Sequence, residues 1–314
     1  MREITITTED SNQRLDKFLK RYFKDASSGF LYKMLRKKNI TYNNKKADGH
    51  EMLQDGDVIS VYFSDETFEK MQGVAASNPM YDWLSSLPHQ HVQVVFENKD
   101  LVVVNKPAGI LTQKSKPEDI SLNDEILAYL ISSQQLSRAR FDLFKPSVAN
   151  RLDRNTTGLV LAGKTLQGQQ FLAEKLRTRD AKKTYHCVVK GIIDHEETKE
   201  AYLKKDSASN LVSIHAIEIP GSKLIRTRFR PIRHTNEYTL LEVDLLTGRT
   251  HQIRAHMAYL GHPVMGDVKY GDTTFNEQYR KSGIRRQMLH AYRIQLPGGI
   301  DCIAEEPEEF AKLF

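Results

Sequence analysis

A single carboxylate, Asp153, lies between two arginines in the segment RLDRNTTGLVLAGKT, which covers residues 151–165. Arg151 and Arg154 would favour the ionised form of Asp153, because nearby cations stabilise a carboxylate charge. If this segment is extended, Arg151 and Asp153 also share one face. A carboxylate that stays ionised can act as a nucleophile or as a base toward carbon. The alternative is a structural ion pair that stabilises the turn before the next strand.

Two other sequence patterns bear on whether the chain has a metal site or a nucleotide-binding loop. His251 and His256 are five residues apart, about 140° around a helix, so they do not form the i, i+4 pair of a zinc site. No cluster of cysteines or carboxylates completes such a site, and we expect no bound metal. The segment Lys106–Gly109 (KPAG) lacks the G-x-x-x-x-G-K-[ST] pattern of phosphate-binding loops. We expect no nucleotide cofactor, and we interpret this segment as a turn that positions neighbouring loops.

The elements that would hold these residues become regular after His89. Strands and helices are interspersed, with a strand, a turn and a second strand in HVQVVFENKDLVVVNKPAG and a helix over 121–136. Alternation in TYHCVVKG places Tyr185, Cys187 and Val189 on one face of a strand. HQIRAHMAYL reads as a helix that Gly261 ends. Several strands are joined by hairpin-length connections. The pattern predicts an α+β domain over 89–314, with a mixed, largely antiparallel sheet flanked by helices.

Residues 1–63 predict a separate small, basic α/β domain. Leu15, Phe18, Leu19 and Tyr22 recur at helical spacing, and Ser27 or Ser28 could cap a second helix. Between residues 11 and 63 there are eleven Lys or Arg and six Asp or Glu, a difference of 11 − 6 = +5. This is most of the formal net charge of +6. So concentrated a charge favours a phosphate backbone as partner over a merely solvated face. The predicted RNA-contacting residues here are Lys33, Arg36, Lys37, Lys38, Lys45 and Lys46.

The remaining sequence gives weaker signals. Residues 64–88 lack strong periodicity, so we interpret them as a linker with some local packing, in which Trp83 packs on one of the domains. The amino-terminal stretch is polar and no apolar run approaches the roughly 20 residues of a membrane span. Cys187 and Cys302 form no disulfide framework. We expect a cytoplasmic protein without a membrane partner, and a monomer by default.

Five segments, in order from about residue 92 to 297, resemble the motifs of the RluA-type pseudouridine synthases. LVVVNKPAGI is similar to the first motif of that family, RLDRNTTGLVLAGKT to the central motif and KKTYHCVVKG to the segment with the active-site tyrosine. LLTGRTHQIRAHMAYLGHPVMGDVKYG resembles the third motif nearly residue for residue, and LHAYRIQLP resembles a later strand. Two positions differ, because the chain has Asn150 where histidine is usual and Thr157 where serine is usual. The amino-terminal piece resembles the small RNA-binding domain shared with a ribosomal small-subunit protein.

The resemblance implies an isomerase that needs no cofactor. The uracil is detached from ribose at nitrogen and rejoined through carbon-5, with Asp153 as the catalytic carboxylate acting either as nucleophile or as base. Tyr185 would stack on the uracil and is a candidate to help remove the carbon-5 proton. Arg254 would pair with Asp153 and hold it ionised. Arg151, Arg154 and Arg249 would contact the RNA backbone and offset the cost of extruding a stacked uridine.

Three functions are consistent with these features. The appended basic domain favours a large structured RNA, so the leading hypothesis is a pseudouridine synthase for large-subunit ribosomal RNA. A transfer RNA substrate is the first alternative. A noncatalytic RNA-binding factor in ribosome assembly is the second, and the joint presence of Asp153, Tyr185 and Arg254 argues against it.

Overall fold

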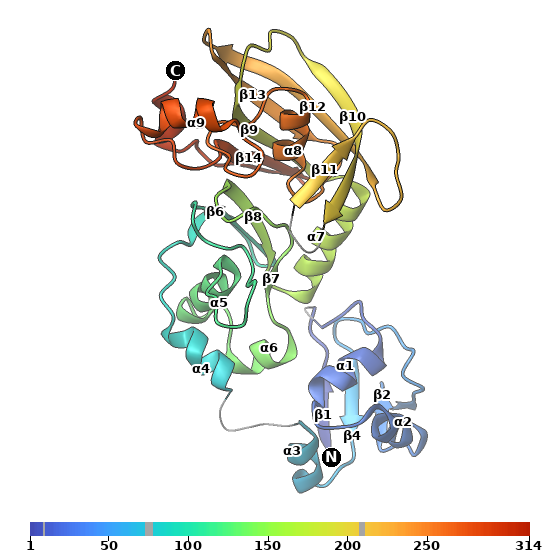
Figure 1. The fold of residues 1–314 in the computed structure, drawn as a ribbon. Coiled ribbons are helices and arrows are strands. Elements are labelled where there is room, and N and C mark those ends of the chain that lie inside the picture. Colours follow the sequence, from blue (N-terminus) through green and yellow to red (C-terminus); the bar gives the residue numbers. More distant parts are fainter. Residues whose placement is uncertain (9, 73–77, 207–210) are drawn as a thin grey trace.

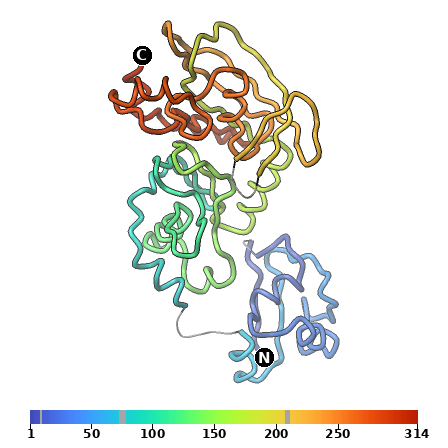
Figure 2. The backbone as a smooth tube through the Cα atoms, viewed as in Figure 1, coloured from blue at the N-terminus to red at the C-terminus, as the bar shows by residue number. Residues whose placement is uncertain are grey.

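The computed structural model describes residues 1–8, 10–72, 78–206 and 211–314. Within these ranges the chain forms a small amino-terminal domain and a larger domain built on one long sheet (Figure 1). The backbone trace in Figure 2 begins in the small domain and ends at the far end of the large one. The mixed, largely antiparallel sheet and its helices confirm the predicted α+β class. No helix among the described residues has the length and apolar character needed to cross a membrane.

The small domain packs two helices on a four-stranded sheet. Its elements are β1 (Arg2–Thr5), α1 (Leu15–Tyr22), α2 (Ser28–Arg36), β2 (Ile40–Tyr42), β3 (Lys45–Lys46) and β4 (Val58–Val61), and the strand order is β1-β4-β2-β3. Leu15, Phe18 and Leu19 are buried along α1, as their helical spacing predicts. Ser27 caps α2, since its hydroxyl accepts a hydrogen bond from the Phe30 amide at 3.2 Å.

The segment over 64–88 holds two helices where the sequence predicts a linker with local packing. They are α3 (Asp65–Gln72) and α4 (Pro79–Ser86). Phe68 of α3 belongs to the core of the small domain, and Leu84 of α4 belongs to the core of the large domain. The ring of Trp83 lies 4.5 Å from the Lys114 ammonium. Each helix therefore extends the domain beside it, and Trp83 lies against the large domain.

The large domain is organised around an eleven-stranded sheet. Its strands are β5 (Gln93–Glu97), β6 (Leu101–Lys106), β7 (Ser147–Val148), β8 (Thr157–Gly163), β9 (Lys182–Lys190), β10 (Glu197–Asp206), β11 (Leu211–His215), β12 (Lys223–His234), β13 (Tyr238–Leu245), β14 (Leu289–Leu296) and β15 (Ile300–Ile303). The strand order is β11-β10-β12-β13-β9-β14-β8-β6-β5, with β15 paired to β14 and β7 to β8.

Six helices accompany this sheet in the described residues. They are α5 (Leu122–Ser132), α6 (Arg138–Leu143), α7 (Leu166–Thr178), α8 (Gln252–Tyr259), α9 (Thr273–Arg280) and α10 (Glu308–Ala311). The main core joins side chains of β6, β8, β9 and β13 to those of α5 and α8. Between the domains, the Lys24 ammonium lies 2.9 Å from the Asp142 carboxylate. The helix predicted over 121–136 is shorter than expected, because α5 ends at Ser132.

The parallel pairing of β8 with β14 joins the two halves of the large sheet. The pairing matches Thr157 with His290 and Gly158 with Ala291. Gly158 has a φ of +107°, and a Cβ added there would lie 2.3 Å from the Ala291 carbonyl oxygen. Only glycine fits this close approach of two backbones. The glycine that follows Thr157 in the sequence is therefore a requirement of the sheet.

Candidate active site

The loop that carries Asp153 is fastened to the turn that follows β6. The Thr112 hydroxyl donates to the Leu152 carbonyl at 2.8 Å and accepts from the Leu152 amide at 3.1 Å. On the other side of Asp153, the Arg154 carbonyl accepts from the Lys106 ammonium at 2.9 Å and from the Gly109 amide at 2.9 Å. Backbone groups on both sides of Asp153 are thus held in place. The sequence predicts this positioning role for Lys106–Gly109.

Lys106 is fully buried beneath this loop. Its ammonium also donates to the Pro107 carbonyl at 2.8 Å. Burial lowers the pKa of Lys106 to about 7, although the nearby Asp153 charge acts in the opposite direction. A neutral amine keeps two N–H donors, which match the two carbonyls. Lys106 can therefore hold the loop in either protonation state.

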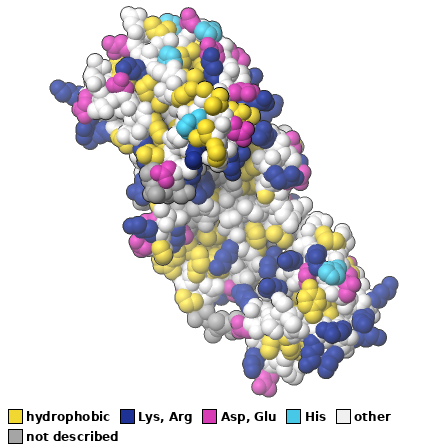
Figure 3. All heavy atoms as spheres, turned by 45° about the vertical axis from the view of Figure 1, so that its right-hand side comes forward, with side chains coloured by type: hydrophobic (Ala, Val, Ile, Leu, Met, Phe, Trp, Pro, Cys, Tyr) yellow, Lys and Arg dark blue, Asp and Glu magenta, His cyan; other side chains and the backbone are white. Residues whose placement is uncertain are grey.

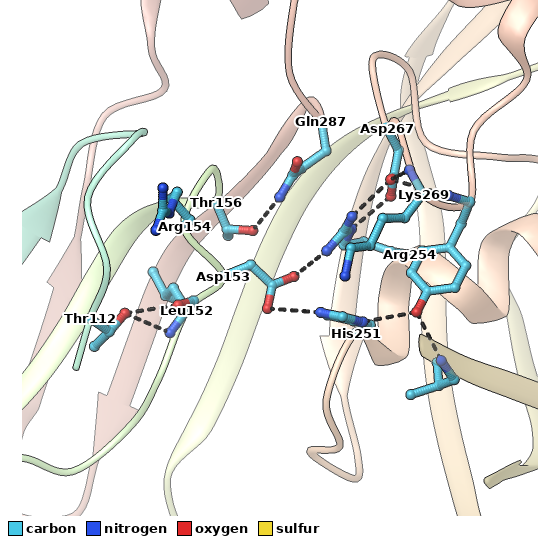
Figure 4. Close-up of polar contacts among 12 residues, drawn as sticks. Thr112, Leu152, Asp153, Arg154, Thr156, His251, Arg254, Asp267, Lys269 and Gln287 are labelled. Atoms are coloured by element: carbon cyan, nitrogen blue, oxygen red, sulfur yellow. Dashed lines mark hydrogen bonds and ion pairs between the residues drawn. The ribbon is translucent and has the colours of Figure 1, made fainter. Parts of the chain in front are cut away.

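Arg254 links Asp153 to a second carboxylate, Asp267. From α8, the Arg254 Nη1 atom lies 2.6 Å from Asp153 Oδ2. Its Nε and Nη2 atoms form a bidentate pair with Asp267, at 2.6 and 2.8 Å. The Arg254 and Asp267 side chains are 5% and 0% exposed, against 28% for Asp153. Figure 4 shows the guanidinium between the two carboxylates. The buried end of this chain of charges is fixed, and the exposed end faces solvent.

The protonation states in this chain follow from the pairing. Burial acts to lower the pKa of Arg254, but its bonds to Asp267 and Asp153 outweigh it and raise the pKa above its usual range. Burial likewise acts to raise the pKa of Asp267, yet the pairing with Arg254 and the amides of Lys269 and Tyr270 lower it overall. Arg254 stays protonated and Asp267 stays ionised. A permanent cation is therefore held against Asp153.

A second contact reaches the other oxygen of Asp153. His251 Nε2 lies 3.7 Å from Asp153 Oδ1, and His251 Nδ1 lies 2.8 Å from the Tyr270 hydroxyl. Tyr270 also accepts a hydrogen bond from the Val212 amide at 3.0 Å. His251 is the residue that precedes α8, and its backbone is left-handed, with a φ of 54°. The start of β11 and the start of α8 are thus tied together through Tyr270 beside Asp153 (Figure 4).

Asp153 opens into a cleft with a volume of about 70 Å³. Tyr185, Ile253, Arg151 and Arg249 are among the side chains that line it. Tyr185 lies on β9, and it shares a buried face with Cys187 and Val189, as the alternation predicts. Burial, with a smaller effect from the Asp153 charge, raises the pKa of Tyr185 above its usual range. Its phenol therefore stays neutral, and its ring forms one wall of the cleft.

The neighbouring arginines do not take the place that the sequence predicts for them. Asp153 pairs with Arg254, which is 101 residues away in the chain. Figure 4 shows Arg154 on the opposite side of the Asp153 loop from Arg254. Arg151, Arg154 and Arg249 are exposed, and Arg151 and Arg249 stand at the cleft. Two of these three cations therefore border the cleft, and the carboxylate pairs with the distant Arg254.

The six predicted RNA-contacting residues of the small domain lie apart from the cleft. All are exposed, on α2, on the turn that follows it and on β3: Lys33, Arg36, Lys37, Lys38, Lys45 and Lys46. In Figure 3, Lys and Arg side chains gather over the small domain. The structure therefore places six of the predicted binding residues in a basic patch on the small domain, and Arg151 and Arg249 at the cleft. "Basic patch" refers below to these six residues.

The two positions that differ from the RluA-type pattern have structural partners. The Asn150 side chain accepts from the Leu161 amide at 2.7 Å and donates to the Leu159 carbonyl at 3.2 Å. It thus ties the start of the Asp153 segment to β8. The Thr157 hydroxyl contacts His290 Nδ1 at 2.7 Å, and the other ring nitrogen contacts a carbonyl at 3.0 Å. Thr157 therefore donates to His290, as a serine hydroxyl could.

Sequence reasoning missed three residues of the site. Asp267 and Tyr270 lie in the GDVKYG part of the segment similar to the third motif, and the spacing of His251 from His256 bears only on metal binding. Their adjacency to Arg254 depends on how the chain after α8 turns back. In the sequence, Gly266 is the one local signal for this turn. In the structure its φ is +75°, and a Cβ added there would lie 2.2 Å from the Arg286 carbonyl oxygen. In the part of the chain that the structure describes, no three His, Cys, Asp or Glu side chains form a metal-binding group.

Comparison with known proteins identifies the family. Residues 100–259 match the sequence profile of RNA pseudouridylate synthase. "Ribosomal large subunit pseudouridine synthase C" of Vibrio cholerae is 31% identical over 93% of this chain and 87% of its own length. The protein of that name in Pasteurella multocida is 32% identical over 93% and 85%. In fold, the chain is similar to "Human RNA Pseudouridylate Synthase Domain Containing 4", with a TM-score of 0.59 at 20% identity over 74% of this chain and 95% of that one.

The match spans both halves of the site. It contains the Asp153 loop, Tyr185 and Arg254, which the geometry above brings to one cleft. The relatives extend it over nearly the whole chain at above 30% identity. The chain belongs to the RNA pseudouridylate synthase family.

Proposed function

We propose that this protein converts specific uridines of large-subunit ribosomal RNA to pseudouridine, with Asp153 as its catalytic carboxylate. The observation that carries the proposal is the position of Asp153, paired with a buried Arg254 yet open to a cleft that Tyr185 lines. The relatives named as large-subunit ribosomal pseudouridine synthases support the choice of RNA. Two buried free cysteines fit a reducing cytoplasm, and we propose that the protein acts there as a monomer.

The reaction exchanges one bond to ribose carbon-1′ for another. The bond from uracil nitrogen-1 breaks, the base turns within the cleft, and carbon-5 bonds to the sugar. The carbon-5 proton then leaves, and nitrogen-1 gains a proton. No electrons enter or leave overall, so the reaction needs no redox cofactor. It requires an ionised carboxylate, side chains that bind the base and exclusion of water.

The residues of the cleft match these requirements. Asp153 is paired with the cationic Arg254, and its carboxylate can attack carbon-1′ or take the proton from carbon-2′. Tyr185 offers its ring to the uracil face. The raised pKa of Tyr185 favours stacking over proton removal, because a phenol that stays protonated is a poor base. Ile253 closes the apolar side of the cleft.

Positive charge would hold the RNA while one nucleotide is extruded. Extrusion costs a few kcal/mol for a stacked base. Arg151 and Arg249 at the cleft can bind the phosphates that flank the extruded nucleotide, and the basic patch can bind a more distant part of the same RNA. Such contacts position the RNA, while the base is recognised inside the cleft.

The activity is tested by mapping pseudouridine in cells. The wild-type chain and Asp153→Asn are expressed in a strain that lacks its own synthases, and ribosomal and transfer RNA are mapped by chemical labelling and primer extension. We expect new stops in large-subunit RNA that disappear with D153N. Asp180→Asn, which changes an exposed carboxylate beyond α7, is the matched control and should keep the stops. Stops that persist in D153N would remove Asp153 from its role, and stops only in transfer RNA would replace the substrate.

The basic patch is tested by the salt dependence of RNA binding. Lys37→Ala with Lys38→Ala removes two exposed cations next to α2. The slope of log affinity against log salt is negative, and each lost phosphate contact should reduce its magnitude by roughly 0.7 to 0.9. The control, Lys281→Ala, removes an exposed cation after α9 and should leave the slope unchanged. An unchanged slope in the double variant would show that this patch does not touch the RNA backbone.

A further inference from the structure

We propose that His251 is a positioning residue that donates a hydrogen bond to Asp153 when a uridine fills the cleft. The inference rests on the proposed function, since it assigns a partner to the catalytic carboxylate. Arg254 holds Asp153 Oδ2 at 2.6 Å, and His251 Nε2 faces Oδ1 at 3.7 Å. Two different side chains thus face the two oxygens of the Asp153 carboxylate.

The contacts of Tyr270 support a proton on the Nε2 atom of His251. The Val212 amide donates to the Tyr270 hydroxyl at 3.0 Å and so occupies a lone pair of that oxygen. The hydroxyl proton of Tyr270 is then free to point at His251 Nδ1, 2.8 Å away. Burial lowers the pKa of His251, with the opposing Asp153 charge a smaller influence, so the ring is neutral at pH 7. With Nδ1 as acceptor, the ring proton is on Nε2 and faces Asp153.

The backbone sets the ring in this orientation. His251 has a left-handed φ of 54°, which non-glycine residues seldom adopt and which tends to occur at functional sites. Its side chain is 6% exposed, so the surroundings hold the ring. At 3.7 Å the Nε2 and Oδ1 atoms are too far apart for a hydrogen bond in the free protein. Catalytic hydrogen bonds of this kind shorten when a substrate excludes water from the site.

A carboxylate with both oxygens held has one remaining orientation toward the substrate. Arg254 alone leaves Asp153 able to rotate about its Cβ–Cγ bond, because Asp153 is held there at one oxygen. A donor at Oδ1 stops that rotation. Misplacement of a reacting group by about 1 Å can cost about a hundredfold in rate. The contribution of His251 should therefore appear in the chemical step and not in RNA affinity.

The test uses a matched pair of substitutions. In His251→Gln, the side-chain amide can reach the position of Nε2 and donate to Asp153. In His251→Asn, the shorter amide can reach Tyr270 but not Asp153. Asparagine tolerates a left-handed backbone better than glutamine does. A defect confined to H251N is therefore not due to backbone strain.

The assay measures release of tritium from uracil carbon-5 of a ribosomal RNA transcript that contains the mapped site. We expect H251N to lower kcat by about tenfold to a hundredfold with KM within twofold of wild type. H251Q should retain at least a third of wild-type kcat, and Tyr270→Phe should lower kcat at unchanged KM because the ring tautomer is no longer fixed. If H251N fails to fold, Y270F still decides, because it leaves the imidazole in place.

Two outcomes would overturn the inference. One is a kcat for H251N or Y270F within twofold of wild type, and the other is an equal loss in folded H251Q and H251N. D153N, measured alongside, separates this failure from failure of the proposed function. An inactive D153N with an unaffected H251N removes only His251 from its role. A fully active D153N removes the catalytic assignment of Asp153 and the inference with it.

Discussion

In the Asp267→Asn variant, the large domain should unfold at a markedly lower temperature than in the wild type. Asp267 Oδ1 accepts bonds from Arg254 Nη2 and from the amides of Lys269 and Tyr270, and Oδ2 accepts from Arg254 Nε. The asparagine oxygen can keep the first three of these bonds. Its amide nitrogen would then face Arg254 Nε, donor against donor, in a place without solvent.

The expected magnitude follows from the burial of the pair. Removing one partner of a buried ion pair costs about 3–5 kcal/mol. Arg254 keeps Asp153, so we expect a loss near the lower end, about 3 kcal/mol. In a domain of this size each kcal/mol shifts Tm by about 2–4 °C, which gives a fall of about 6–12 °C. Asp153→Asn is the matched control, because Asp153 is partly exposed and its loss leaves Arg254 paired with Asp267. Its cost should be smaller, about 1 kcal/mol, because the Asp153 end of the pair reaches solvent and an asparagine oxygen can still accept from Arg254.

Thermal unfolding followed by calorimetry and by the fluorescence of the single tryptophan measures both variants. Trp83 lies in α4 and reports on the large domain. The depressed pKa of Asp267 adds a second expectation, because its stabilising effect is present above the unfolded pKa of about 3.9 and is lost as pH falls through the lower folded value. The difference between wild type and D267N should therefore shrink below about pH 4. A D267N protein that melts no lower than D153N would refute the reasoning.

Two further predictions concern the turn after β6 and the joint between β8 and β14. Lys106→Met removes an amine whose pKa burial lowers to about 7. The unfolded lysine keeps its proton up to about pH 10.4, so the wild type should become more stable relative to K106M as pH rises from about 7 to 10. Urea unfolding at pH 7 and 9 measures the difference in free energy of unfolding between the two proteins. An equal difference at both pH values would contradict the expectation. Gly158→Ala should yield little folded protein, whereas Gly109→Ala should fold with a modest loss of stability. Both glycines have a positive φ, but of these two only Gly158 would bring an added Cβ within 3 Å of backbone atoms. Equal soluble yield and equal Tm for the two variants would remove the steric explanation.

Periodicity and short motifs predicted the parts of this molecule that depend on local order. The alternation around Tyr185 and the helical spacing in α1 placed the right side chains inside, because one face of each element is buried. The helices α3 and α4 are not predicted because residues 64–88 lack a strong apolar periodicity, whereas α1, which is equally short, has one. In α4 a local signal was present, since Asn78 caps the helix and Pro79 occupies its first turn.

The partners of Asp153 could not be predicted from its neighbours in the chain. Arg151 and Arg154 suggested a local ion pair, but the loop turns these side chains toward its surface. The resemblance indicated Arg254, whereas the support from Asp267 and from His251 depends on how two loops fold over α8. Such pairings join residues that are far apart in sequence, and composition or spacing carries no information on them. The small-domain patch was predictable because it arises from charges that are close in the chain.

The residues of the active site come together across the pairing of β8 with β14 and do not all lie on one half of the large domain. Asp153 precedes β8, whereas Tyr185 lies on β9 and Arg254 on α8, both beyond β14, and β8 meets β14 over two residue pairs. A slight parting of these halves would separate the carboxylate from its guanidinium and would loosen the core that the two halves share. Because α4, which carries Trp83, packs against α5 and not at this joint, turnover in mild denaturant should fall before the tryptophan fluorescence changes.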